Sequence, residues 1–200
     1  MALFDYIPVA FFAIAAIILM RDLYNGMSKS SFALFSTGSI MISVAGCLKA
    51  TWKLLYAAGI CDFAALNNMF FPTQSIGFLL AGLGLVLMLA DSPKTKLRST
   101  VPPVFSGTFV FVGLMVVGLG VMDFVLCVLA KKMKKPWLIA LFIISFVCSL
   151  GMGYLSTKDF AEASMNWIAE FVNVVGQGSL LLGVYLMDKN GLQNLEFEVN

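Results

Sequence analysis

The stretch FVFVGLMVVGLGVMDFVLCVLA, residues 109–130, decides the fold class. Its 22 residues include a single charged side chain, Asp123. A helix needs about 20 apolar residues to cross the hydrocarbon core of a bilayer, which is about 30 Å thick. A helix also satisfies its own backbone hydrogen bonds, as any segment exposed to lipid must. The stretch therefore predicts a transmembrane helix.

Five further apolar segments accompany this one. The six expected helices cover about residues 4–20, 31–51, 69–90, 103–130, 137–156 and 163–187. Hydrophobic residues make up 60% of the chain and charged residues only 12%, whereas a soluble domain carries about 25% charged residues. We therefore expect an all-α integral membrane protein. It forms a bundle of about six transmembrane helices in one domain, residues 1–200, among the lipids of the plasma (inner) membrane.

Residue types that are missing exclude several classes of function. The chain contains no histidine, which removes histidine-ligated haem and zinc, Ser-His hydrolysis and histidine proton relays. The sequence has no GxxxxGK[ST] nucleotide motif, and its cysteines, Cys47, Cys61, Cys127 and Cys148, form no CxxC pair. The net charge of +2 offers no basic surface for nucleic acid. The sequence predicts no metal, cofactor or nucleic-acid partner, and it disfavours an enzyme.

Basic residues leave the orientation in the membrane almost undecided. With the N-terminus outside, six lie on the cytoplasmic side: Arg21, Lys29, Lys94, Lys96, Arg98 and Lys158. Seven lie on the outer side, when two at a helix end are included: Lys131, Lys132, Lys134, Lys135, Lys189, Lys49 and Lys53. The positive-inside rule barely separates the two orientations. Arg21 and Lys29, which follow the first segment, favour an outer N-terminus.

Two alternatives would account for the misplaced lysines at 131–135. In the first, segment 103–130 enters the membrane and returns as a re-entrant loop, so that both basic loops face the cytoplasm. In the second, the chain inserts in both orientations and two copies pair antiparallel.

A faint internal repeat divides the chain. Residues 62–91 align without gaps on residues 159–188, with seven identities in thirty, including a shared Asp-Phe-Ala start and a shared final aspartate. The repeat predicts two pseudo-symmetric three-helix halves, 1–91 and 101–188. Because each half has an odd number of spans, the second would be inverted against the first, as in many transporters.

A polar stripe interrupts the last apolar segment. Asn166, Glu170, Asn173 and Gln177 follow one another at spacings of 4, 3 and 4 residues, which places them on one helical face. Unpaired polar groups in hydrocarbon cost several kcal/mol each, so this face must look into the bundle or into water. One interpretation is the wall of a solute pathway, with Glu170 as proton carrier or cation ligand. The other is a set of hydrogen bonds between packed helices.

Two lysines and an aspartate lie in other apolar segments. Lys49 and Lys53, one turn apart, either extend to the lipid headgroups or face Glu170 or Asp123 as intramembrane partners. Asp123 is the most deeply placed acid, and it is either a packed carboxyl group or one that holds a proton for coupling.

Gln74 follows Pro72 at the start of the segment 69–90. A proline in the first turn of a helix is ordinary. Deeper in the helix it would bend the backbone and free carbonyl groups for a substrate, with Gln74 beside them.

These features predict a small transporter or channel-like carrier for a small polar or amphipathic solute, coupled to protons through intramembrane carboxylates. Its site would use Glu170, Asn173, Gln177 and Asn166, with Asp123, Lys49, Lys53 and Gln74. The alternative is a ligand- or lipid-binding membrane sensor or subunit that acts with a partner protein. The chain could also form a homo-oligomer. The third class, an intramembrane lipid-modifying enzyme, lacks any catalytic motif.

Overall fold

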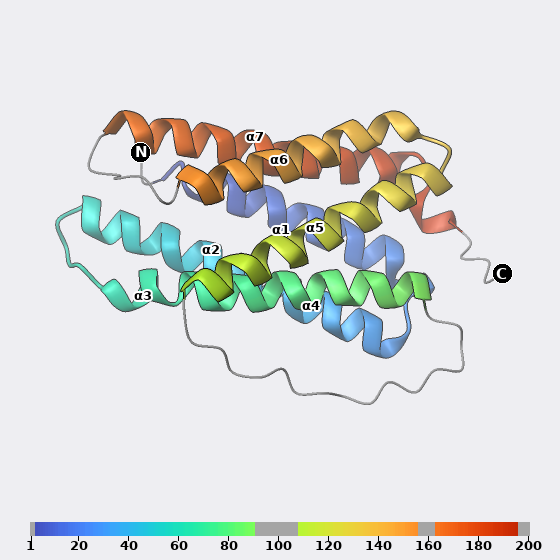
Figure 1. Cartoon of the computed structure of the whole chain (residues 1–200), viewed down its shortest axis with the longest axis horizontal. Helices are drawn as coiled ribbons and strands as arrows, with labels where there is room; N and C mark the ends of the chain where they lie inside the picture. Colours follow the sequence, from blue (N-terminus) through green and yellow to red (C-terminus); the bar gives the residue numbers. More distant parts are fainter. Residues whose placement is uncertain (1–2, 91–107, 156–162, 196–200) are drawn as a thin grey trace.

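The protein is a bundle of long helices (Figure 1). The structure is a computed structural model that describes residues 3–90, 108–155 and 163–195. The long helices are α1 (Tyr6–Leu23), α2 (Lys29–Ala57), α4 (Phe70–Ala90), α5 (Thr108–Lys132), α6 (Ile139–Leu155) and α7 (Ala163–Lys189). A short helix α3 (Ala64–Asn68) leads into α4, and single 3₁₀ turns are formed by Tyr24–Gly26, Pro136–Leu138 and Leu192–Asn194. These ranges contain no strand.

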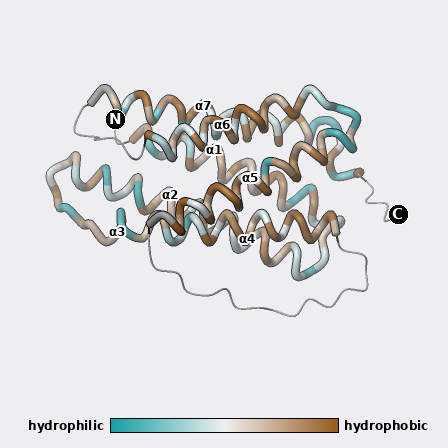
Figure 2. Tube along the Cα trace, in the orientation of Figure 1, coloured by the Kyte–Doolittle hydropathy of each residue, from teal (hydrophilic) through white to brown (hydrophobic). Residues whose placement is uncertain are grey.

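Within the described ranges, six helices are long and apolar enough to cross a membrane. Each covers one of the six apolar segments, so the expected helix count is confirmed and a multi-pass membrane protein is supported. Figure 2 shows hydrophobic residues along the helices and hydrophilic residues gathered toward their ends. Helix α2 extends beyond its apolar run at both ends. At its start Ser28 caps the first turn, because its Oγ accepts a hydrogen bond from the Ser31 N–H at 3.2 Å. At its end the helix continues to Ala57.

One continuous apolar core holds the helices together. Helix α2 packs on α4, α4 on α5, α6 on α7, and α1 on both α7 and α2. Large side chains of several helices are fully buried in it, including Leu23, Phe35, Leu85, Leu126, Phe142 and Met187. Because all six long helices contribute, the core fixes their relative positions.

Helices α4 and α5 pack in parallel. Ser75 of α4 donates a hydrogen bond to the carbonyl oxygen of Phe111 at 2.7 Å, and two turns further along, Gly82 lies against Gly118 and Val121. Residue numbers therefore rise together along both helices, as Figure 1 shows. A Cβ on Gly118 would lie 2.5 Å from the Leu79 backbone nitrogen, so this contact is made by bare backbone.

The parallel packing differs from two expectations. In the bundle of Figure 1, helices α1, α2 and α4 run in the same sequence of directions as α5, α6 and α7, whereas the repeat predicts that the second set is inverted against the first. The re-entrant alternative for 103–130 is wrong over its described part, since Thr108–Lys132 is one unbroken helix. Of its glycines, Gly118 packs against the backbone of α4 and Gly120 against Phe146 of α6, and the helix continues through both. Residues 103–107 lie outside the described ranges.

Candidate functional site

Charged side chains gather at the end of the bundle where α1 and α7 begin and α2 ends. We name Asp5, Lys49, Lys53 and Glu170 the charged cluster. Asp5 comes directly before α1, the two lysines lie one turn apart in the last three turns of α2, and Glu170 lies two turns into α7. Glu170 is 6% exposed and Asp5 is 9% exposed. Three helices thus bring two acids and two bases into a mostly buried position.

Asp5 is the centre of the charged cluster. The Lys53 ammonium donates to Asp5 Oδ1 at 2.7 Å. The carboxyl groups of Asp5 and Glu170 lie close enough to share a hydrogen bond, and both Lys49 and Lys53 act electrostatically on Glu170. A hydrogen bond between two carboxyl groups requires that one of them carries a proton. The Asp5–Glu170 pair is therefore suited to hold a proton beside two ammonium groups.

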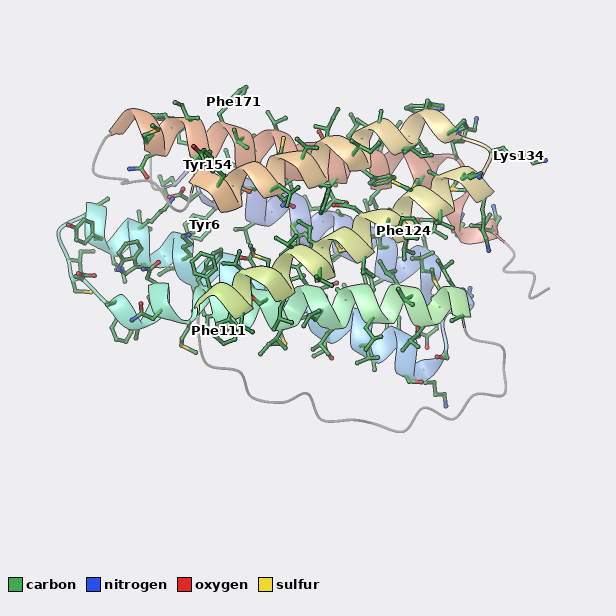
Figure 3. All side chains as sticks on the ribbon, viewed as in Figure 1. Tyr6, Phe111, Phe124, Lys134, Tyr154 and Phe171 are labelled. Carbon is green, nitrogen blue, oxygen red and sulfur yellow. The ribbon has the colours of Figure 1, made fainter. Side chains whose placement is uncertain are left out.

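Aromatic and hydroxyl contacts surround the charged cluster. The Lys49 ammonium lies 4.1 Å from the centroid of the Phe70 ring, a cation–π contact. Tyr6, labelled in Figure 3, has its hydroxyl 2.8 Å from Thr51 Oγ1, which ties the start of α1 to α2. Because Phe70 begins α4, these contacts connect the charged cluster to a fourth helix.

The polar stripe of α7 continues from Glu170 into the bundle. Gln177 lies two turns beyond Glu170, and its Oε1 is buried without a hydrogen-bond partner among the described residues. Asn173 and Asn166 are half-buried, and Asn166 has an interaction partner. Phe171, next to Glu170 in the sequence, is instead 70% exposed and points away from the bundle in Figure 3. The stripe is therefore the inward face of α7.

Asp123 lies apart from the charged cluster. It is on α5, 3% exposed, and neither of its carboxylate oxygens has a hydrogen-bond partner in the described part of the chain. Of the two partners considered for the lysines, the structure brings Glu170 to them and leaves Asp123 elsewhere. Asp123 is thus a second, isolated polar position inside the bundle.

Gln74 is half-buried on α4, one turn after the Phe70 ring that Lys49 contacts. Pro72 is the third residue of α4, and the helix runs unbroken to Ala90. Proline in the first turn lacks only an N–H that has no intrahelical partner there. The ordinary interpretation of Pro72 therefore fits the structure, and no freed carbonyl group lies beside Gln74 on its account.

Further polar atoms are buried in the interior of the bundle. Ser39 and Ser145 are buried, and their hydroxyl groups have no hydrogen-bond partner among the described residues. Ser39 lines a small cavity with room for about one water molecule. The other residues around this cavity are Phe12, Ala15, Ala16, Leu19, Phe35, Met122 and Leu180.

Asp5 and these two serines were not among the residues predicted for the site. Asp5 shares its end of the bundle with Lys53, a relation that follows from two consecutive antiparallel spans. A single serine in an apolar run carries no comparable signal, since serine is common where helices pack. Across the described residues, no three His, Cys, Asp or Glu side chains are grouped so as to hold a metal ion.

The charged cluster and the interior polar atoms offer ion-pair exchange, proton holding and hydrogen bonding. Comparison of the chain with family models, with curated proteins and with solved structures finds no match.

Proposed function

We propose that the protein is a small multi-pass carrier of the plasma (inner) membrane that moves a small polar or amphipathic solute with proton coupling. The observation that carries this proposal is a set of buried polar atoms that have no hydrogen-bond partner among the described residues. They are Glu170 Oε1, Gln177 Oε1, the hydroxyl groups of Ser39 and Ser145, both carboxylate oxygens of Asp123, and Asp22 Oδ2. Each such group is costly in an apolar interior, and a pathway for polar solutes requires such groups.

The charged cluster supports the choice of solute class. It presents carboxyl and ammonium groups within one site, so a solute carrying either charge finds an exchangeable partner. An amine competes with Lys53 for Asp5, and a carboxylate competes with Asp5 for Lys53. In either case the Asp5–Glu170 hydrogen bond is disturbed, and the proton that it contains is released or taken up. Solute binding and proton binding are coupled in this way.

A second candidate is a lipid- or ligand-binding subunit that works with a partner protein. It is favoured by the aromatic residues at the charged end, since Trp52 and Tyr56 stack with ring centroids 5.9 Å apart and Trp167 is half exposed. Aromatic side chains of this kind mark the headgroup level of a membrane. A charged cluster at that level is suited to a lipid headgroup, reached from one side only.

Aqueous access to the α7 stripe separates the two candidates. Single cysteines at Asn173 and Gln177, in a chain whose four own cysteines are replaced by alanine, are exposed to a membrane-impermeant maleimide in vesicles of both orientations. The carrier predicts that reagent on either side labels both positions in every copy, whereas the binding subunit predicts that each copy is labelled from one side only. A cysteine at Phe171, on the outward face of the same helix, is the control that should stay unlabelled.

Glu170→Gln tests proton coupling in the same preparation. The substitution keeps the shape of the side chain and removes its acid. We expect the pH dependence of labelling at 173 and 177 to disappear, because access then no longer depends on a proton at the Asp5–Glu170 pair. Complete protection of both positions from both sides would overturn the carrier.

A further inference from the structure

The parallel packing of α4 and α5 conflicts with the sequence that joins them. Ala90, the end of α4, and Thr108, the start of α5, lie at opposite ends of the bundle (Figure 1). Helix α4 has 21 residues and is therefore about 31 Å long, close to the thickness of the hydrocarbon core. Within one chain, residues 91–107 would have to connect one side of the membrane to the other.

The composition of residues 91–107 forbids that crossing. The sequence DSPKTKLRSTVPPVFSG contains four charged residues and three prolines in 17 positions. Its fully extended reach of about 56 Å is sufficient, so length is not the obstacle. Lysine, arginine and aspartate are strongly disfavoured at the centre of a bilayer, and a proline-rich segment cannot satisfy its backbone there as a helix does. In a bilayer this segment stays on one side, and α5 must then run opposite to the α4 of its own chain.

We propose that the parallel α4–α5 contact is made between two copies of this chain inserted in opposite orientations. The first half of one copy, α1–α4, packs on the second half of the other, α5–α7, in the arrangement of Figure 1. Inverting the second copy turns its α5 parallel to the α4 of the first. The pair contains this arrangement twice, once in each orientation.

The distribution of basic residues supports insertion in both orientations. With alternating spans, six basic residues face one side of the membrane and seven face the other, so the positive-inside rule selects neither orientation. In the structure, seven described basic residues share the end opposite the charged cluster: Arg21, Lys29, Lys131, Lys132, Lys134, Lys135 and Lys189. Figure 3 shows Lys134 at that end and Tyr6 near the other. In the pair, one of these basic ends faces each side of the membrane.

We call this packing of one copy's first half on the other copy's second half the exchange, and the two copies the exchanged pair. The exchange also makes the charged cluster a site shared by the two copies. Asp5, Lys49 and Lys53 come from the first half, and Glu170 comes from the second half. Each cluster is then completed by the partner copy, and the pair holds one cluster toward each face of the membrane. The interface itself follows from helix direction and charge, and it stands whatever the site binds.

Cross-linking between differently tagged chains tests the exchange. Arg21 of α1 and Asp188 of α7 form an ion pair between the two halves, at a water-accessible end where the Arg21 side chain is 60% exposed. One tagged chain carries Arg21→Cys and the other carries Asp188→Cys, both without native cysteines, and a short bismaleimide is added to membranes. We expect a cross-linked product that contains both tags.

Two matched control samples show whether a cross-linked product comes from the exchanged pair or from a single chain. When both tagged chains carry Arg21→Cys, the two cysteines lie on opposite sides of the membrane in the exchanged pair, and no product should form. When one chain carries both cysteines and the other carries neither, the product should stay absent within the single chain. Cross-linking confined to the doubly substituted chain would overturn the exchange, and so would the absence of any product in all samples.

Labelling of loop residues gives an independent reading of orientation. Asn25→Cys and Lys131→Cys, each exposed, are treated in intact cells with an impermeant maleimide, before and after permeabilisation. The exchanged pair predicts that about half of each cysteine is labelled from outside, since the pair has one copy in each orientation. Labelling of either position wholly on one side would overturn the proposal.

Discussion

Lys53 Nζ lies 2.7 Å from Asp5 Oδ1, and this contact joins the last turns of α2 to the residue that precedes α1. The Asp5 side chain is almost fully covered and the Lys53 side chain is one-third exposed, at 9% and 33%. The pair therefore lies between a surface ion pair and a buried one, and its contribution to stability should lie between the two as well.

A double-mutant cycle measures that contribution. We expect Asp5→Asn and Lys53→Met to interact with a coupling free energy of about 1–3 kcal/mol, intermediate between exposed and buried pairs. The measurement is thermal unfolding in detergent of the two single variants and the double variant. Tyr6→Phe, which removes the neighbouring hydrogen bond to Thr51, should show no comparable coupling to Lys53→Met. Additive effects of Asp5→Asn and Lys53→Met would contradict the prediction.

Two buried serines should respond oppositely to the same substitution. Ser31 and Ser145 are both 0% exposed, but Ser31 donates to the Gly84 carbonyl oxygen at 2.6 Å, whereas the Ser145 hydroxyl has no partner among the described residues. Ser31→Ala should lower the free energy of unfolding by about 0.6–1.5 kcal/mol. Ser145→Ala should leave it unchanged or raise it. Equal losses in thermal stability would show that Ser145 is hydrogen-bonded after all.

Asp123 should be dispensable for folding and required for transport. Both of its oxygens are buried without partners in the described residues, so Asp123→Leu, of similar shape, should raise the free energy of unfolding by about 1–3 kcal/mol. The same variant should lose pH-dependent access of the α7 stripe if Asp123 belongs to the pathway. Thermal unfolding and maleimide labelling of 177 check the two parts separately. A destabilised Asp123→Leu protein would mean that the carboxyl group holds the bundle together.

Two glycines of α5 provide a matched pair. A Cβ on Gly118 would lie 2.5 Å from the backbone of α4, and a Cβ on Gly113 would meet nothing within 4 Å. Gly118→Ala should destabilise the protein by about 1–3 kcal/mol through overpacking, whereas Gly113→Ala should stabilise it by up to about 1 kcal/mol through helix propensity. Thermal unfolding compares them directly. If the two variants behave alike, the close backbone approach of α4 and α5 is absent in the membrane.

The lysines of the α5–α6 turn should control orientation. Replacing Lys131, Lys132, Lys134 and Lys135 with glutamine leaves six basic residues on one side of the alternating arrangement against Lys189, Lys49 and Lys53 on the other. This bias should fix the N-terminus outside. Outside labelling of Asn25→Cys should then fall from about half to none, and the cross-link between 21 and 188 should vanish. Arg21→Gln with Lys29→Gln is the control, which should increase outside labelling of Asn25→Cys.

The sequence predicts the six helices because hydrocarbon imposes a length and a composition on each of them. Those two constraints act on one segment at a time, and so they place Phe70–Ala90 and Thr108–Lys132 within a few residues. The relative direction of α4 and α5 depends on contacts between segments, such as Ser75 with Phe111. No property of either segment alone contains that information, so the sequence could not predict that these two helices pack in parallel.

In the candidate site, too, properties of a single helix were predictable and contacts between helices were not. Helical spacing correctly places Glu170 and Gln177 on the inward face of α7, since that depends on one helix. The sequence left open whether Lys49 and Lys53 face Glu170 or Asp123, because the answer depends on which helices pack against each other. Asp5 was overlooked because it lies outside the helix that it precedes. The roles of all these residues in transport stay predictions.

The glycines of α2 and α4 have a consequence for motion. A Cβ on Gly38 would overlap the backbone of Gly77 and Ala81, and one on Gly84 would overlap Phe35 and Ser31. An interface of bare backbone has no side-chain rotamers to rearrange, so it cannot slide in small steps as other helix contacts do. Helices α2 and α4 therefore move as one rigid body that includes both lysines. Opening of the site must come from the other elements that line it: from α7, which carries Glu170 away from a stationary pair of ammonium groups, or from the start of α1, which carries Asp5.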